Sequence, residues 1–153
     1  MIWSDPPMSE INPIPDGFHR VTPYLVCDDV SKLLDFVARA FYAEVKEKME
    51  VPSGTVMHAD VLIGDSHVMM GQACEGNPAM PSMLYLYVED CDAAFQKAIG
   101  AGAESIQEPA DQFYGDRSGG VRDPLGNQWW FGTRIENVPP EELARRAAAQ
   151  SGS

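Results

Sequence analysis

The sequence has little of what a disulfide scaffold, a metal–thiolate site or a membrane span requires. Its three cysteines, Cys27, Cys74 and Cys91, are an odd number and include no Cys-x-x-Cys pair, which is typical of reduced thiols that pack as small apolar side chains. No apolar run approaches the roughly 20 residues that cross a bilayer. Residues 1–16 carry acidic residues and four prolines rather than a basic start and an apolar run, so we expect no secretory signal and a cytoplasmic protein.

Positive charge is also scarce. There are 11 lysines and arginines against 23 acidic residues, and the net charge is −12. A chain this acidic repels phosphate backbones and anionic lipids, so we expect neither nucleic acid nor a membrane as partner. No strand–glycine–helix element typical of adenosylmethionine binding is present. What remains is an ordinary globular composition over 153 residues, enough for one domain or for two small modules that share a core.

The chain shows one pattern twice. Residues 1–18 are predicted to form a flexible arm, because they combine prolines with no periodicity. After them an alternating strand runs into an acidic helix cap, an amphipathic helix follows, and three strands separated by turns complete the unit. The first copy is predicted at 20–27, 30–42, 43–51, 55–63 and 67–73, and the second at 82–88, 93–101, 104–108, 120–122 and 128–133. The two copies align at their strand-to-cap junctions, about 60 residues apart, which indicates internal duplication.

These predictions give three regions after the arm. Module one covers residues 19–74 and module two covers 80–138, and together they form a paired βαβββ domain of class α+β over 19–138. Residues 139–153 are predicted to form a C-terminal helix and tail, since two prolines precede an amphipathic stretch.

Several motifs in the right order resemble one superfamily. Asp29 with Phe36 and Phe41-Tyr42 resembles its first helix, residues 85–94 (YLYVEDCDAA) resemble its second junction, and residues 123–127 (DPLGN) resemble the turn before its last strand. On these residues the chain resembles the vicinal oxygen chelate proteins, which include glyoxalases, bleomycin-resistance proteins and ring-cleaving dioxygenases. Further segments resemble the demethylubiquinone-methyltransferase-like glyoxalase branch: 21–25, 56–66, 114–117 and 135–146.

The resemblance implies two βαβββ modules whose strands curl into a cupped, barrel-like mixed sheet, the glyoxalase/bleomycin-resistance fold. It also implies a homodimer, in which modules pair within one chain or are exchanged between chains. In metal-using members the ligands come from four positions, which here are Thr22, Gly71, Met83 and Trp130. A hydroxyl, a thioether, an indole and a glycine do not form a site for zinc, nickel or iron, so we predict no metal and no cofactor.

Strand alternation predicts what lines the cup instead, because successive side chains point to opposite faces. The residues expected to face it and contact a ligand are Thr22, Tyr24, Met83, Tyr85, Tyr87, Gln128 and Trp130. Aromatic walls with a few polar groups are typical of sites for planar or apolar small molecules. The alternative is that these side chains simply fill the space of the lost metal.

Four polar residues add candidate chemistry. His58 and Asp60 are two apart on one strand and therefore share a face, which favours a general-base pair; the alternative is a polar pair with a structural role. His67 is a possible second nitrogen nearby. Arg117 is a candidate for an anionic group of a ligand, although it is equally explained as a residue that ties its loop to the sheet.

The function these observations favour is metal-independent binding of a small aromatic or amphipathic molecule, as in the resistance and sequestration members that the sequence resembles. The alternative is a glyoxalase-like lyase, an isomerase or a dioxygenase-type enzyme, which uses His58 as base or a rebuilt metal site. A third possibility is a duplicated scaffold with a collapsed cavity.

Overall fold

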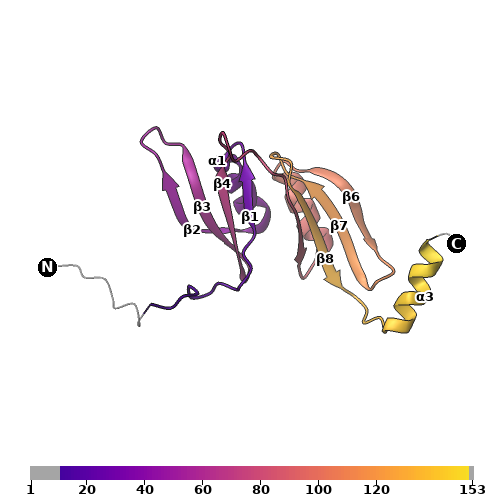
Figure 1. The fold of residues 1–153 in the computed structure, drawn as a ribbon. Coiled ribbons are helices and arrows are strands. Elements are labelled where there is room, and N and C mark those ends of the chain that lie inside the picture. Colours follow the sequence, from indigo (N-terminus) through magenta and orange to yellow (C-terminus); the bar gives the residue numbers. More distant parts are fainter. Residues whose placement is uncertain (1–10, 152–153) are drawn as a thin grey trace.

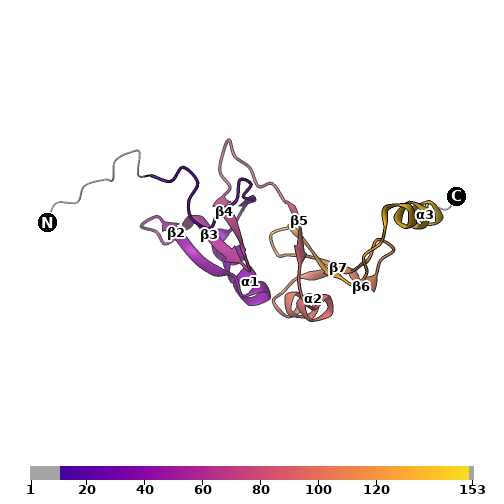
Figure 2. The same ribbon diagram turned by 90° about the horizontal axis from the view of Figure 1, so that it is seen from below.

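The computed structural model describes residues 11–151 and shows two modules side by side (Figure 1). The first ten residues of the predicted arm and the last two residues of the tail lie outside the described range. Each module is a four-stranded mixed sheet with one helix, so the α+β class and the duplicated βαβββ order are confirmed. Figure 2 shows that the two helices lie next to each other, on the same side of the two sheets.

Module one begins where an alternating strand meets an acidic cap. Its elements are β1 (Tyr24–Cys27), α1 (Val30–Phe41), β2 (Glu44–Glu50), β3 (Val56–Ile63) and β4 (Ser66–Gln72). The strand order is β1-β4-β3-β2, with β1 parallel to β4 and the other pairs antiparallel. The carboxylate of Asp29 accepts a hydrogen bond from the backbone N–H of Lys32 at 3.0 Å, which is the N-cap that the sequence predicts.

Module two repeats this arrangement. Its elements are β5 (Met83–Tyr87), α2 (Cys91–Gly100), β6 (Glu104–Asp111), β7 (Asp116–Arg122) and β8 (Gln128–Arg134), in the strand order β5-β8-β7-β6. The cap of α2 is Asp90, whose carboxylate accepts from the backbone N–H of Ala93 at 3.1 Å. The equivalent caps explain why both strand-to-helix junctions share one sequence pattern.

The modules share a single core between the sheets and the helices. Alternate residues of each sheet are buried on the helix side, among them Val61 and Met70 in module one and Trp129 and Phe131 in module two. The ring of Phe41, at the end of α1, bridges them, with ring centroids 4.8 Å from Trp129 and 5.7 Å from Phe131. Aromatic contacts of this kind contribute about 0.5–1.5 kcal/mol each beyond area burial, so they tie the two modules together.

The Asp123 turn before β8 has a structural role. Its carboxylate accepts from the backbone N–H groups of Leu125 and Asn127 and, at 2.8 Å, from the indole N–H of Trp129. Asp123 and Trp129 are both buried, so this carboxylate satisfies donors that would otherwise lack partners in the core.

Two strands begin four residues away from their predicted start. The first strand begins at Tyr24 rather than at residue 20: Pro23 has no N–H to donate, and Val21 is 82% exposed. In module two, β7 starts at Asp116 rather than at residue 120 and runs through Gly119-Gly120. Glycine is needed at these two positions, because the Trp130 ring and the backbone of β6 lie where a Cβ atom would be.

The sheets do not close. The sequence predicts a barrel-like sheet, whereas the described residues form two separate sheets. The outer edge of β1 meets only the connecting segment, through a bridge between Val26 and Met80, and β5 pairs with β8 alone within the described chain. One chain therefore leaves a strand edge of each sheet without a full partner strand.

The last helix, α3 (Pro140–Gln150), lies beyond module two at the far end of the molecule from module one (Figure 1). It has no buried residue and is held through Arg146, whose guanidinium donates to Glu136 at 2.8 and 2.9 Å and to the carbonyl oxygen of Phe113 at 3.0 Å. Among the described residues no helix has the length and apolar character to cross a bilayer.

Candidate functional site

The face of each sheet opposite its helix, called here the concave face, carries the candidate site residues. In module two the parallel register pairs Met83 with Gln128, Tyr85 with Trp130 and Tyr87 with Gly132, so all six residues lie on the concave face. Three of these side chains are open to solvent: Met83 is 64% exposed, Tyr87 62% and Tyr85 41%. This face is therefore an uncovered aromatic surface.

Glycines make room for rings that lie flat on this surface. A Cβ atom on Gly120 would lie 2.6–2.7 Å from three atoms of the Trp130 indole, and one on Gly132 would overlap the Tyr85 ring and hydroxyl. In module one a Cβ atom on Gly71 would overlap Tyr24 in the same way. Each ring thus rests directly on backbone of the neighbouring strand.

A buried carboxylate fixes the two tyrosines of module two. Asp116 accepts hydrogen bonds from the hydroxyls of Tyr85 and Tyr87 at 2.9 and 3.0 Å and from Nε of Arg134 at 3.1 Å. Burial raises the pKa of Tyr85, and Asp116 raises it further; the nearby Ser118 hydroxyl acts in the opposite direction. Hydrogen bonds to Tyr87 and Asp116 raise the pKa of Arg134. The Tyr85 phenol therefore remains a protonated donor to Asp116.

Ser118 lies on the same face as Asp116, at a register position opposite Gly132. It is 1% exposed, and its hydroxyl has no well-formed hydrogen bond within the described residues. Buried hydroxyls without partners are uncommon because they lose their hydration without compensation. Module two therefore holds one polar atom with spare hydrogen-bonding capacity under its aromatic surface.

Module one places its polar residues in two pairs. His58 and Asp60 share the concave face, as the alternation predicts, but they do not bond to each other. The Tyr24 hydroxyl lies 3.2 Å from Nδ1 of His58, and Asp60 bonds instead to Nδ1 of His67, at 3.0 and 3.1 Å. The carboxylate that was expected to orient His58 therefore orients His67.

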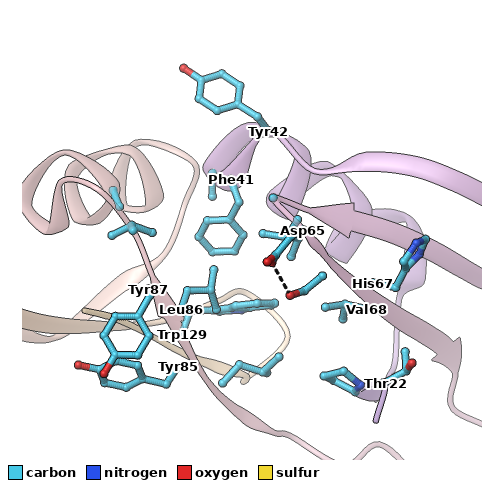
Figure 3. A pocket seen from close by; sticks show the side chains of 18 of the residues that line it. Thr22, Phe41, Tyr42, Asp65, His67, Val68, Tyr85, Leu86, Tyr87 and Trp129 are labelled. Atoms are coloured by element: carbon cyan, nitrogen blue, oxygen red, sulfur yellow. Dashed lines mark hydrogen bonds between the residues drawn. The ribbon is translucent and has the colours of Figure 1, made fainter. Parts of the chain in front are cut away.

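A groove separates the two modules (Figure 3). Its volume is about 1100 Å³, and it runs along the unpaired edge of β5 and past the β3–β4 turn. Apolar side chains line much of it, including Phe41, Leu84, Leu86 and Trp129. Figure 3 shows Thr22 and His67 on the side of module one, opposite Tyr85 and Tyr87, whose hydroxyls point away from the groove.

Two of the predicted ligand contacts lie elsewhere. Thr22 precedes β1 and lines the groove rather than a strand of the concave face. Arg117 points to the helix side of module two: its guanidinium donates to both oxygens of Asp92 at 2.6 and 2.9 Å and to Asp111 at 3.0 Å. These carboxylates raise the pKa of Arg117. The sequence left open whether Arg117 contacts a ligand or holds its own segment in place. In the structure it joins β7 to α2 and β6.

Comparison with known proteins identifies the family. The model of the Glyoxalase/Bleomycin resistance protein/Dioxygenase superfamily matches residues 17–131. The chain belongs to this superfamily. An uncharacterised protein of Mycobacterium bovis is 34% identical to it over 141 residues, which cover 85% of this chain and 93% of the relative.

Solved structures of the superfamily share the fold. TioX from Micromonospora sp. ML1 is 26% identical, with a TM-score of 0.66 over 76% of this chain and 99% of TioX. Lactoylglutathione lyase from Agrobacterium tumefaciens is 18% identical, with a TM-score of 0.60 over 80% of this chain and 96% of that protein, a likeness of fold alone. The resemblance to the demethylubiquinone-methyltransferase-like branch stays a prediction.

The four positions that the resemblance assigns to metal ligands do not fit a metal here. Gly71 has no side chain, and the Tyr24 ring covers it. The Trp130 indole lies flat on Gly120, and its N–H donates to Gln128 at 3.0 Å. A thioether at Met83 and a hydroxyl at Thr22 complete a set with no imidazole, thiolate or carboxylate. Elsewhere within residues 11–151, no three His, Cys, Asp or Glu side chains gather as a metal site.

Sequence reasoning missed the most connected polar group of the site. Asp116 was interpreted as a loop residue, because the strand was predicted to start only at 120. Alternation continued back from Gly120 would have placed Ser118 and Asp116 on the concave face and Arg117 on the other. The stacking of Phe18 on His67, with ring centroids 3.8 Å apart, had no signal in the sequence because the two residues belong to distant segments.

Proposed function

We propose that this protein binds a small, flat aromatic molecule without a metal, on the concave aromatic faces of its modules. One observation carries the proposal: Tyr24, Tyr85 and Trp130 lie flat on the glycine backbone of the neighbouring strand. Flat, rigid rings held by hydrogen bonds offer stacking surface at a small entropic cost. The bound molecule would stack on these rings, and its polar groups would reach His58 or Gln128.

The site is completed by a second copy of the chain, as the resemblance implies. In one chain both concave faces are open, and Tyr24, Met83, Tyr85 and Tyr87 are each more than 40% exposed. Contiguous exposed apolar surface of this kind marks an interaction site. The groove and the unpaired edge of β5 lie beside it, which favours a partner that supplies a strand and an apolar face. Two of the three free cysteines are buried, and unpaired thiols fit the reducing cytoplasm that we infer for the complex.

The test is a thermal-shift screen of flat aromatic compounds, with 2-naphthol as the reference probe. We expect a saturable rise in melting temperature, since a ligand that binds only the folded state stabilises it by mass action. Trp130→Leu should abolish the shift. The matched control is Val45→Ala, which removes an exposed apolar side chain from the helix side of β2 and should leave it unchanged. A folded protein that no aromatic compound stabilises would contradict the proposal.

Two solution measurements accompany the screen. Sedimentation at micromolar concentration should give twice the chain mass, and Tyr87→Glu should shift the protein toward the monomer. Elemental analysis of protein purified without chelators should find no stoichiometric divalent metal, and added Zn²⁺, Ni²⁺ or Mn²⁺ should not move the melting temperature. A monomeric wild type would refute the shared site, and stoichiometric metal would refute the metal-independent mode.

One observation favours a second candidate, a glyoxalase-like lyase or isomerase. A carboxylate that binds one imidazole nitrogen fixes the tautomer and the orientation of the ring, as a general base requires. The Asp60–His67 pair has this geometry, whereas His58 has only the Tyr24 hydroxyl. The discriminating assay is formation of S-lactoylglutathione, with and without added divalent metal, by wild type and His67→Gln. Turnover that requires His67 would replace the binding proposal with an enzymatic one.

A further inference from the structure

The His67 ring in module one is built as a fixed platform. Both oxygens of Asp60 lie 3.0–3.1 Å from its Nδ1, and the carboxylate itself is 4% exposed. The side chain of His67 is 11% exposed. A ring held this firmly offers one face of constant position and orientation.

That face is already covered by a ring of the same chain. Phe18 stacks on His67 with centroids 3.8 Å apart and an angle of 17° between the ring planes. Near-parallel contact at this distance is the geometry of an aromatic ring in a stacking site. Phe18 therefore shows directly which kind of group the His67 platform accepts.

The segment that carries Phe18 is otherwise weakly attached. The hydrogen bonds that involve residues 11–19 join residues of this segment to one another, as from the backbone N–H of Phe18 to the carbonyl oxygen of Pro15 at 3.0 Å. Most of these residues are exposed, and Phe18 and Ile14 are the partly buried ones. Segments with few tertiary contacts open at low free-energy cost.

We propose that the His67 platform is a stacking subsite for a planar aromatic ring and that Phe18 is its built-in competitor. This inference rests on the proposed binding function and deepens it, because it assigns the ring of the ligand to a position in module one. His67 also lines the groove between the modules, so a molecule in the groove reaches the platform without crossing the sheet. Binding there requires Phe18 to swing away, and the apparent affinity is lowered by the fraction of molecules in which it covers the ring.

The experiment compares 2-naphthol binding by wild type, Phe18→Ala and Phe18→Trp, each checked for an unchanged circular dichroism spectrum. A stack worth about 0.5–1.5 kcal/mol corresponds to a competitor whose removal strengthens binding about 2- to 10-fold. Phe18→Ala should show that gain, and Phe18→Trp should not. In the Phe18→Ala background, His67→Leu should cancel the gain. Where the wild type binds 2-naphthol, equal or weaker binding by folded Phe18→Ala would overturn the inference.

A second readout keeps this inference separate from the proposed function. Indole is titrated to millimolar concentration into Phe18→Ala while the His67 ring protons are followed by NMR. Stacking should move them upfield by the ring current, and the wild type should show a much smaller change. If no protein binds 2-naphthol but indole shifts His67 in Phe18→Ala, the proposed function fails and the subsite stands. If indole leaves His67 unmoved, the subsite is refuted whatever 2-naphthol does.

Discussion

The Tyr85 ring lies across Gly132 of the neighbouring strand, in the space that a Cβ atom would fill. Tyr24 lies across Gly71 in module one in the same way, and the two tyrosines are separated by the same number of residues as the two glycines. In both modules the covered glycine pairs with the residue two positions after the tyrosine. The duplication has therefore preserved an interaction between side chain and backbone as well as the order of the elements.

Gly132→Ala tests this arrangement. The added methyl group cannot coexist with the Tyr85 ring, so the ring must leave the sheet or the strands must separate. We expect a loss of about 1–3 kcal/mol in the free energy of unfolding, as for other overpacked sites, measured by urea denaturation. The control is Gly100→Ala at the end of α2, where the new methyl meets nothing within 4 Å. That change should be neutral or slightly stabilising, and equal losses in both variants would contradict the role of the Tyr85–Gly132 contact.

Tyr85 should make stability fall at alkaline pH. Its pKa is raised above the ordinary value of 10.0, first by burial and then by Asp116, so folding favours the protonated phenol. This contribution is complete below the unfolded pKa and is lost as the pH rises above it. Between about pH 9 and pH 11, the free energy of unfolding should fall more steeply for wild type than for Tyr85→Phe. Parallel curves for the two proteins would show that Tyr85 does not titrate as its surroundings require.

The Arg117 ties should matter for stability and not for binding. Two carboxylates, Asp92 and Asp111, share its guanidinium on the helix side of module two. Exposed ion pairs each contribute little to stability, so Arg117→Ala should lower the free energy of unfolding only slightly. Salt at 1 M should reduce the difference, because it screens exposed charges. If Arg117→Ala stays folded but no longer binds 2-naphthol, Arg117 belongs to the site after all.

The sequence predicted the features that depend on local patterns. Alternation assigned the faces of β5 and β8 correctly, and the acidic caps at Asp29 and Asp90 begin both helices. It did not predict which partner a polar side chain takes on the neighbouring strand, since Asp60 bonds to His67 rather than to His58. The direction of Arg117 was missed because the strand was predicted to start at residue 120 rather than at Asp116, which left Arg117 in a loop where alternation assigns no face.

Variants at Tyr42 can separate the cost of a strained backbone from the stability that a side-chain contact provides. Tyr42 ends α1 with φ 55°, ψ 33°, the left-handed region that side chains other than glycine enter at a cost. Its ring lies under Lys97 of α2, whose ammonium is 3.9 Å from the ring centroid and also contacts the hydroxyl. Tyr42→Ala and Tyr42→Gly both remove the contact with Lys97, but only the change to glycine would relieve the backbone.

We therefore expect Tyr42→Gly to be more stable than Tyr42→Ala by about 1 kcal/mol, measured by urea denaturation at pH 7. The difference in the free energy of unfolding between wild type and Tyr42→Gly then equals the contribution of the tyrosine contact minus the backbone strain that glycine relieves. Lys97→Met should reproduce much of that loss, because it removes the charge and keeps the apolar stem. If alanine and glycine are equally stable at position 42, the left-handed conformation costs nothing here. The retention of tyrosine at the helix end would then be explained by its contact with α2 alone.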